Sequence, residues 1–112
     1  MTVTLYGLKG CDTCKKALKA LELAGKSAEF IDIRTETDLT MKVPLWLDAA
    51  GIKLLNKAST TWRGLPETDK QSGQTNPAPL LMANPTLIKR PVIEADGVVY
   101  VGWKKDVQDA LL

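Results

Sequence analysis

Two cysteines, Cys11 and Cys14, lie three positions apart where a short apolar run gives way to a helical pattern. Residues 3–6 include the β-branched and aromatic types common in strands, and apolar residues recur at spacings of three and four after Cys11. The cysteines therefore fall at a helix N-terminus, where unpaired N–H groups and the helix dipole stabilise a thiolate. This placement predicts a reactive Cys11 at the helix cap and Cys14 one turn inside.

Other roles for the pair fit the sequence less well. A zinc site needs about four ligands, whereas the chain has two cysteines and no histidine. Buried thiols can also serve only as small core side chains. However, Gly10 before the pair and Lys15 and Lys16 after it describe an accessible, electropositive turn. We therefore expect redox or nucleophilic thiol chemistry and no metal.

Composition limits the class of protein. A chain of 112 residues, with 45% hydrophobic and 25% charged residues, is typical of one globular domain with a single core. The net charge is +2 and the sequence has no dense basic run, so it does not indicate a basic surface for binding nucleic acid or membranes. The sequence has no signal-peptide pattern and no apolar run long enough to cross a bilayer. We expect a cytoplasmic monomer, in a reducing compartment where a thiol pair can cycle.

The beginning of the chain predicts a β-α-β unit. The strand at residues 3–6 is followed by a helix that ends at Gly25 and by a second strand at residues 30–33. Strands joined in this way are expected to be parallel, with a right-handed crossover.

The middle of the chain, about residues 38–85, predicts a helical insert. One helix is expected to be capped by Thr40, with Pro44 in its first turn. Residues 67–74 are polar and include Gly73, which predicts a loop or a weak helix.

The last part of the chain predicts a hairpin and a helix. Asp96-Gly97 lies between two β-rich runs, the strongest short-range signal of a hairpin. Residues 104–112 then show a helical pattern. The order β-α-β, helices, β-β-α predicts an α/β fold with a mixed central sheet.

This order, with C-x-x-C after the first strand, resembles the thioredoxin fold with a helical insert in place of its usual middle helix. The insert and residues 87–92 resemble the ArsC/Spx family, which includes glutaredoxin-linked arsenate reductases and the Spx transcription regulators. The resemblance covers essentially the whole chain and is closest to the YffB branch, regarded as ArsC-like thiol reductases that use glutathione. Its most specific motifs are Leu5-Tyr6-Gly7, Cys11-Asp12-Thr13, Lys15-Lys16-Ala17, Leu55-Asn56, Thr60-Thr61-Trp62-Arg63, Ile88-Lys89-Arg90-Pro91 and Val101-Gly102-Trp103.

The resemblance implies roles for individual residues. Cys11 matches the nucleophile, Arg90 the arginine that helps to hold the oxyanion, and Pro91 the cis-proline beside the active thiol. A guanidinium is always charged and presents a planar fork of donors, so it suits a thiolate or an anionic substrate. The arsenate reductases use three arginines, and Asn56 and Gly102 align with the other two, which makes arsenate a less expected substrate.

The favoured function is therefore a glutathione-dependent thiol-disulfide oxidoreductase. Cys11 attacks sulfur, Arg90 stabilises negative charge, and Cys14 or external glutathione resolves the intermediate. Glutathione is the expected co-substrate, a small thiol or oxyanion the expected substrate, and no bound cofactor is expected. The residues expected to contact the substrate are Asp12, Thr13, Lys15 and Pro91.

A second function stays open. The chain combines a YffB-like body with the C-x-x-C of Spx, whose second cysteine belongs to a redox switch. An Spx-like regulator would bind RNA polymerase when Cys11 and Cys14 form a disulfide.

Overall fold

The structure, a computed structural model, describes residues 2–112. Its elements follow the predicted order β-α-β, helices, β-β-α, and the α/β fold is confirmed. The chain forms two compact units. One contains the chain up to Thr37 together with Arg90–Leu112, and the other is Asp38–Lys89.

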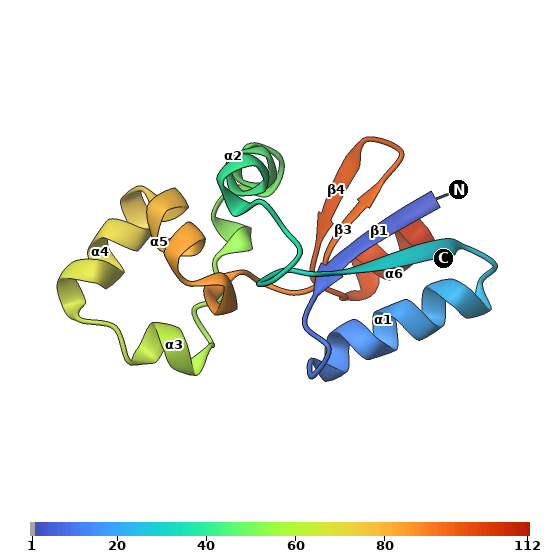
Figure 1. The fold of residues 1–112 in the computed structure, drawn as a ribbon, viewed down its shortest axis with the longest axis horizontal. Coiled ribbons are helices and arrows are strands. Elements are labelled where there is room, and N and C mark those ends of the chain that lie inside the picture. Colours follow the sequence, from blue (N-terminus) through green and yellow to red (C-terminus); the bar gives the residue numbers. More distant parts are fainter. Residues whose placement is uncertain (1) are drawn as a thin grey trace. The chain divides into compact units, whose positions relative to one another are not determined.

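The first unit contains four strands: β1 (Thr2–Gly7), β2 (Ser27–Asp32), β3 (Val92–Ala95) and β4 (Val98–Val101). They form one mixed sheet in the order β2-β1-β3-β4 (Figure 1). The central strand β1 pairs in parallel with β2 and antiparallel with β3, and β3 pairs antiparallel with β4. The predicted parallel pair and mixed sheet are confirmed. β2 begins at Ser27, before the predicted residues 30–33, because it pairs along the whole of β1.

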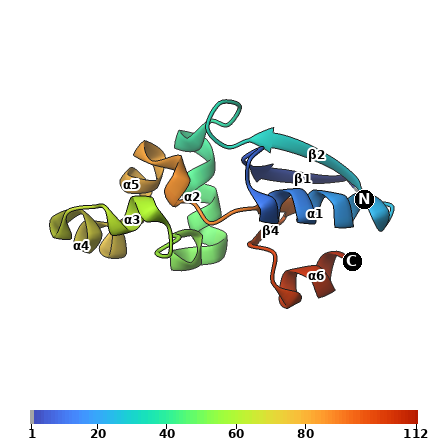
Figure 2. The ribbon, with the colours of Figure 1, turned by 90° about the horizontal axis from the view of Figure 1, so that it is seen from below.

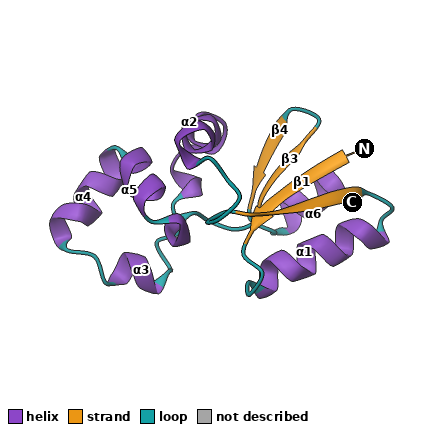
Figure 3. Cartoon of the chain, in the orientation of Figure 1, coloured by secondary structure: helices purple, strands orange, loops and turns teal. Residues whose placement is uncertain are grey.

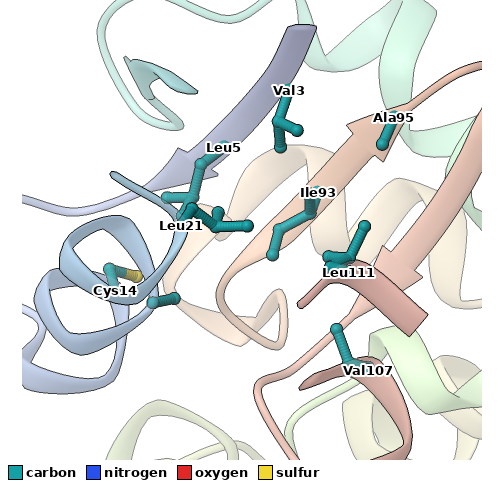
Figure 4. Packing of buried hydrophobic residues seen from close by; sticks show 9 residues of the cluster. Val3, Leu5, Cys14, Leu21, Ile93, Ala95, Val107 and Leu111 are labelled. Atoms are coloured by element: carbon teal, nitrogen blue, oxygen red, sulfur yellow. The ribbon is translucent and has the colours of Figure 1, made fainter. Parts of the chain in front are cut away.

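Two helices, α1 (Asp12–Leu23) and α6 (Lys105–Leu111), pack on the same face of this sheet (Figure 2). Alternate residues of β1 and β3 point towards that face and meet the apolar sides of both helices. The side chains turn towards one another in Figure 4. The buried cluster consists of Val3, Leu5, Cys14, Ala17, Leu21, Ile93, Ala95, Val107 and Leu111. Cys14 is therefore part of the core.

The hairpin between β3 and β4 forms at the predicted Asp96-Gly97 turn. Both residues have positive φ angles, 50° for Asp96 and 78° for Gly97. Such a turn matches the twist of the two strands that it joins, and aspartate and glycine tolerate it better than other residues.

The second unit is helical apart from one isolated β-bridge between Leu55 and Ile88 (Figure 3). The N–H of Asn56 donates to the Leu87 carbonyl at 2.7 Å, and the N–H of Lys89 donates to the Leu54 carbonyl at 2.7 Å. These bonds join segments far apart in the unit's sequence. Its elements are α2 (Leu39–Ala50), the 3-10 helix η1 (Gly51–Leu54), α3 (Thr60–Arg63), α4 (Glu67–Thr75), α5 (Pro77–Ala83) and the 3-10 helix η2 (Pro85–Leu87).

The prediction that Thr40 caps the first of these helices is wrong. α2 begins at Leu39, Asp38 occupies the N-cap position two residues before Thr40, and Pro44 lies inside the helix. Val43 and Trp46 are fully buried while Pro44 is exposed. Packing of the apolar side therefore carries the helix past the proline, whose missing N–H removes one backbone hydrogen bond.

The polar residues 67–74 form a helix, α4, which is one of the two alternatives that their composition predicts. Gly73 explains how this helix packs. A Cβ atom at this glycine would lie 2.7 Å from Cδ2 of Leu80 and 3.1 Å from Cζ3 of Trp62. Gly73 therefore lets α4 approach both side chains closely, a tertiary contact that helical propensity does not reveal.

Candidate active site

The two cysteines lie at the junction of β1 and α1, as predicted. Cys11 occupies the N-cap position of α1, with extended backbone angles φ −86° and ψ 115°. Its N–H donates to the Leu8 carbonyl at 3.0 Å, and its carbonyl accepts from the N–H of Lys15 at 3.1 Å. Cys11 is partly exposed, whereas Cys14 is fully buried.

The surroundings of Cys11 favour a thiolate. Partial burial acts to raise the pKa of Cys11. Four groups oppose this effect and hold the pKa of Cys11 below its ordinary value. They are the N–H and the thiol of Cys14, the charge of Arg90 and the N–H of Thr13. Cys11 therefore combines access with activation, the two properties of a nucleophilic thiol.

Cys14 is the opposite case. Burial raises its pKa to about 12, against the lowering effect of the Leu8 N–H, and both the hydrogen bond to Cys11 and the negative charge of Cys11 raise it further. The Cys14 thiol thus keeps its proton and donates it in a hydrogen bond to the Cys11 sulfur.

Gly7 makes room for the buried thiol. A Cβ atom at this position would lie 2.5 Å from Sγ of Cys14 and 3.2 Å from its Cβ. The last residue of β1 is therefore packed directly against Cys14, so the backbone of the strand fixes the depth of this thiol.

Arg90 and Pro91 precede β3 and lie in the same unit as the cysteines. The peptide bond between them is cis, the geometry that the resemblance implied. Pro91 is buried, and its carbonyl accepts from the N–H of Gly102 at 2.8 Å. The Arg90 Nε atom is buried without a hydrogen-bond partner among the described residues. Arg90 acts electrostatically on both thiols.

Cys11 opens onto a cavity of about 400 Å³. The cavity brings the predicted Cys11 and Arg90 together with residues that the sequence analysis did not assign to the site. Its lining consists of Leu8, Lys9, Gly10, Cys11, Asp32, Arg34 and Arg90. Asp32 is the last residue of β2 and Arg34 lies in the turn after it. A sequence signal for them exists, because carboxyl ends of parallel strands meet at one sheet edge, the usual position of ligand sites.

The remaining predicted residues lie around this cavity differently. Asp12 and Thr13 are exposed in the first turn of α1 and are not among the described residues that line the cavity. The N–H of Thr13 faces the Cys11 sulfur itself. Lys15 lines a second, more apolar cavity of about 300 Å³, together with Leu8, Lys9, Cys14, Leu18 and Phe30.

Two further features concern metals and membranes. Within residues 2–112, no three Cys, Asp or Glu side chains gather in a way that could hold a metal ion. Across the same residues, none of the helices has the length and apolar character needed to cross a membrane.

A mixed sheet, a C-x-x-C pair at the start of the first helix and a cis-proline before β3 define a thioredoxin-like protein. Residues 6–111 match the ArsC family, and the chain belongs to this family.

Individual relatives agree with this assignment. An uncharacterised protein of Haemophilus influenzae is 41% identical over 111 residues, which cover 96% of this chain and 97% of the relative. The solved structure of a protein named YFFB has a TM-score of 0.86 and 36% identity, with 98% of each chain covered. An arsenate reductase (ArsC) related protein from Brucella melitensis has a TM-score of 0.76 and 39% identity, with 98% of this chain and 93% of that chain covered. The resemblance to YffB is confirmed.

Proposed function

We propose that this protein is a thiol-disulfide oxidoreductase that uses glutathione and has Cys11 as its nucleophile. The observation that carries the proposal is the contrast at the start of α1. Cys11 opens onto a cavity and has a lowered pKa, whereas Cys14 is buried and protonated. The Brucella melitensis relative, described as related to arsenate reductase, supports a redox role.

The reaction consists of two thiol-disulfide exchanges. The Cys11 thiolate attacks the glutathione sulfur of a mixed disulfide, forms a Cys11–glutathione disulfide and releases the other thiol as a thiolate. A second glutathione, as its thiolate, then attacks the glutathione sulfur of that intermediate. This step releases oxidised glutathione and regenerates the Cys11 thiolate. The proton of the second glutathione passes through solvent to the thiolate released first.

The neighbours of Cys11 lower the barrier by stabilising negative sulfur. The N–H groups of Thr13 and Cys14 and the charge of Arg90 favour the thiolate in the resting state and again when it leaves in the second step. Cys14 donates a hydrogen bond, and its raised pKa disfavours its own attack on the intermediate. External glutathione is therefore the proposed resolving thiol.

Two aspects of the proposal concern substrate and place. Arsenate is the less favoured substrate. The resemblance implies three arginines for arsenate reductases, and this chain has a matching arginine, Arg90, at one of the three positions. The proposed place of action is the cytoplasm, where a reducing environment keeps both cysteines free between turnovers.

The decisive experiment is reduction of a glutathione-mixed disulfide by wild type, with glutathione as donor, across a pH series. The expected turnover rises with pH through an apparent pKa below the value of about 8.5 for a free cysteine. Wild type that reacts no faster than glutathione alone would exclude the proposed activity.

An alternative function rests on the hydrogen bond between the two thiols. Their contact allows an intramolecular disulfide, so an Spx-like switch that binds RNA polymerase in the oxidised state is the second candidate. Equilibrium binding of oxidised and reduced protein to purified RNA polymerase tests it. Equal affinity of the two forms, or no binding by either, would exclude the regulator.

A further inference from the structure

We propose that Arg34 determines substrate specificity by binding a carboxylate of the thiol compound whose sulfur reacts at Cys11. This inference rests on the proposed function and names the class of substrate that the site selects, namely thiols and disulfides that carry carboxylates, glutathione among them.

Arg34 reaches the cavity from a different strand than Cys11. β1 and β2 are parallel, and Gly7 pairs with Asp32 at the end of both strands. The segments that follow therefore leave the sheet at the same edge. Cys11 and Arg34 end up in one cavity of about 400 Å³, although they are far apart in sequence.

The backbone of Arg34 is held in place by the turn that follows β2. Oδ1 of Asp32 accepts hydrogen bonds from the N–H of Arg34 at 2.8 Å and from the N–H of Thr35 at 3.1 Å. The Asp32 carbonyl accepts from Oγ1 of Thr37 at 3.0 Å, and the Asp32 N–H donates to Oε1 of Glu36 at 3.0 Å. Because this backbone is already fixed, less conformational entropy is lost when the Arg34 side chain binds a ligand.

The hydrogen bond in this turn comes from the backbone N–H of Arg34, and the exposed Arg34 guanidinium adds a smaller electrostatic attraction to the Asp32 carboxylate. The hydrogen bonds of this turn to the Asp32 carboxylate also hold the pKa of Asp32 below its usual range. Asp32 thus stays ionised at neutral pH, with Oδ1 already occupied by N–H donors. Its role is to position Arg34.

The charges around the cavity favour an anionic ligand. Three cationic side chains, Lys9, Arg34 and Arg90, line it with the single carboxylate of Asp32. A guanidinium binds a carboxylate through two parallel hydrogen bonds, which suits a compound such as glutathione with its two carboxylates.

Arg90 and Arg34 have different roles in the proposed site. Arg90 lowers the pKa of Cys11 through its charge, whereas Arg34 lines the same cavity from the segment that follows β2. Arg34 therefore contacts a part of the substrate away from the reacting sulfur. Its loss should weaken binding of a carboxylate and leave the thiolate as reactive as before.

The test compares two disulfides in single-turnover reactions of reduced protein, with the mixed disulfide on Cys11 followed by mass spectrometry. Oxidised glutathione carries carboxylates, and hydroxyethyl disulfide is neutral. In both cases Cys11 attacks one sulfur and one thiolate leaves. We expect Arg34→Gln to slow the reaction with oxidised glutathione by roughly twofold to fivefold, as for a solvated ion pair, and to leave the reaction with hydroxyethyl disulfide unchanged.

Three further measurements make the test specific. Arg34→Lys should recover part of the preference, because the charge remains without the planar fork. Lys16→Gln removes an exposed charge on α1 outside the cavity lining and should leave the preference unchanged. The pH profile of Cys11 alkylation by iodoacetamide should be the same in Arg34→Gln and wild type.

The outcomes separate this inference from the proposed function. A reactive wild type whose preference for oxidised glutathione survives in Arg34→Gln would overturn the role of Arg34 alone. An equal loss for both disulfides would do the same, since it would indicate a general effect on the site. A wild type that reacts with neither disulfide would overturn both proposals.

Discussion

The cap of α1 and the buried side of its first turn carry the same kind of residue in opposite states. At the cap, Cys11 faces a cavity, accepts hydrogen bonds from the N–H groups of Thr13 and Cys14, and has a lowered pKa. One turn further, Cys14 belongs to the core, lies against Gly7, and has a pKa of about 12. The comparison teaches that a C-x-x-C motif does not assign equal chemistry to its two thiols. Burial keeps the Cys14 thiol protonated, whereas the N–H groups directed at Cys11 favour its thiolate.

The different roles of Cys11 and Cys14 can be tested first by replacing each cysteine in turn. Cys11→Ser should abolish reduction of a glutathione-mixed disulfide, by more than roughly a thousandfold, because the nucleophile is lost. Cys14→Ser should stay within about tenfold of wild type, because in the proposed reaction a second glutathione resolves the intermediate and the serine hydroxyl can still donate to Cys11. Steady-state turnover of both variants checks this. Reductase activity retained by Cys11→Ser would show that the assignment of the nucleophile is wrong.

The packing side of the comparison can be tested at Gly7. Gly7→Ala places a methyl group against the Cys14 sulfur and should lower the free energy of unfolding by about 1–3 kcal/mol. In a Cys14→Ala background the sulfur is absent, so the same change should cost less. Urea unfolding of the four proteins in this double-mutant cycle gives the coupling. Additive effects would mean that Gly7 and Cys14 do not constrain each other.

The two opposite pKa shifts predict a dependence of stability on pH. The pKa of Cys14 is raised on folding, so its contribution is complete below the unfolded value near 9 and is lost as pH rises towards about 12. By pH 10, wild type should lose about 1 kcal/mol more than Cys14→Ala, relative to pH 8. Cys11 has the reverse sign, since a lowered pKa stabilises the fold above the unfolded pKa. Urea unfolding at the two pH values would contradict this prediction if both proteins lost the same free energy.

The smallest expected effect concerns Arg90, whose charge ranks behind burial and the contacts with Cys14 among the groups that set the pKa of Cys11. Arg90→Met should raise the pKa of Cys11 and slow its alkylation by iodoacetamide at pH 7 by roughly twofold to tenfold. Arg90→Lys, which keeps the charge, is the matched control. An unchanged alkylation profile in Arg90→Met would remove Arg90 from the stabilisation of the thiolate.

Much of the fold could be predicted from local sequence. The parallel strands around α1, the Asp96-Gly97 hairpin and the last helix follow from side-chain alternation, helical spacing and turn residues, which act over a few positions. The same local signals place Cys11 at the cap of α1. The error lies at the start of α2, where Asp38 rather than Thr40 occupies the N-cap position, and the open choice between loop and helix at residues 67–74 is decided by the close packing of α4 at Gly73.

The candidate site was only partly readable in this way. Cys11 and Arg90 could be proposed from the motif and the resemblance, and they line one cavity. Arg34 could not be singled out, because an arginine after a strand is usually a solvated side chain. The predicted parallel pairing indicates the edge of the sheet that the Arg34 segment reaches, and the observed pairing of Gly7 with Asp32 places that segment beside Cys11.

The sequence by itself determined the order of the elements, the position of the C-x-x-C pair at a helix N-terminus and the family to which the chain belongs. Tertiary structure alone decided which thiol is buried against Gly7, how far the two pKa values separate, and which cations share the cavity with Cys11. The physical reason is the separation in sequence over which each interaction acts. Propensity and periodicity act between neighbours in sequence, whereas burial, desolvation and electrostatics depend on residues that only folding brings together.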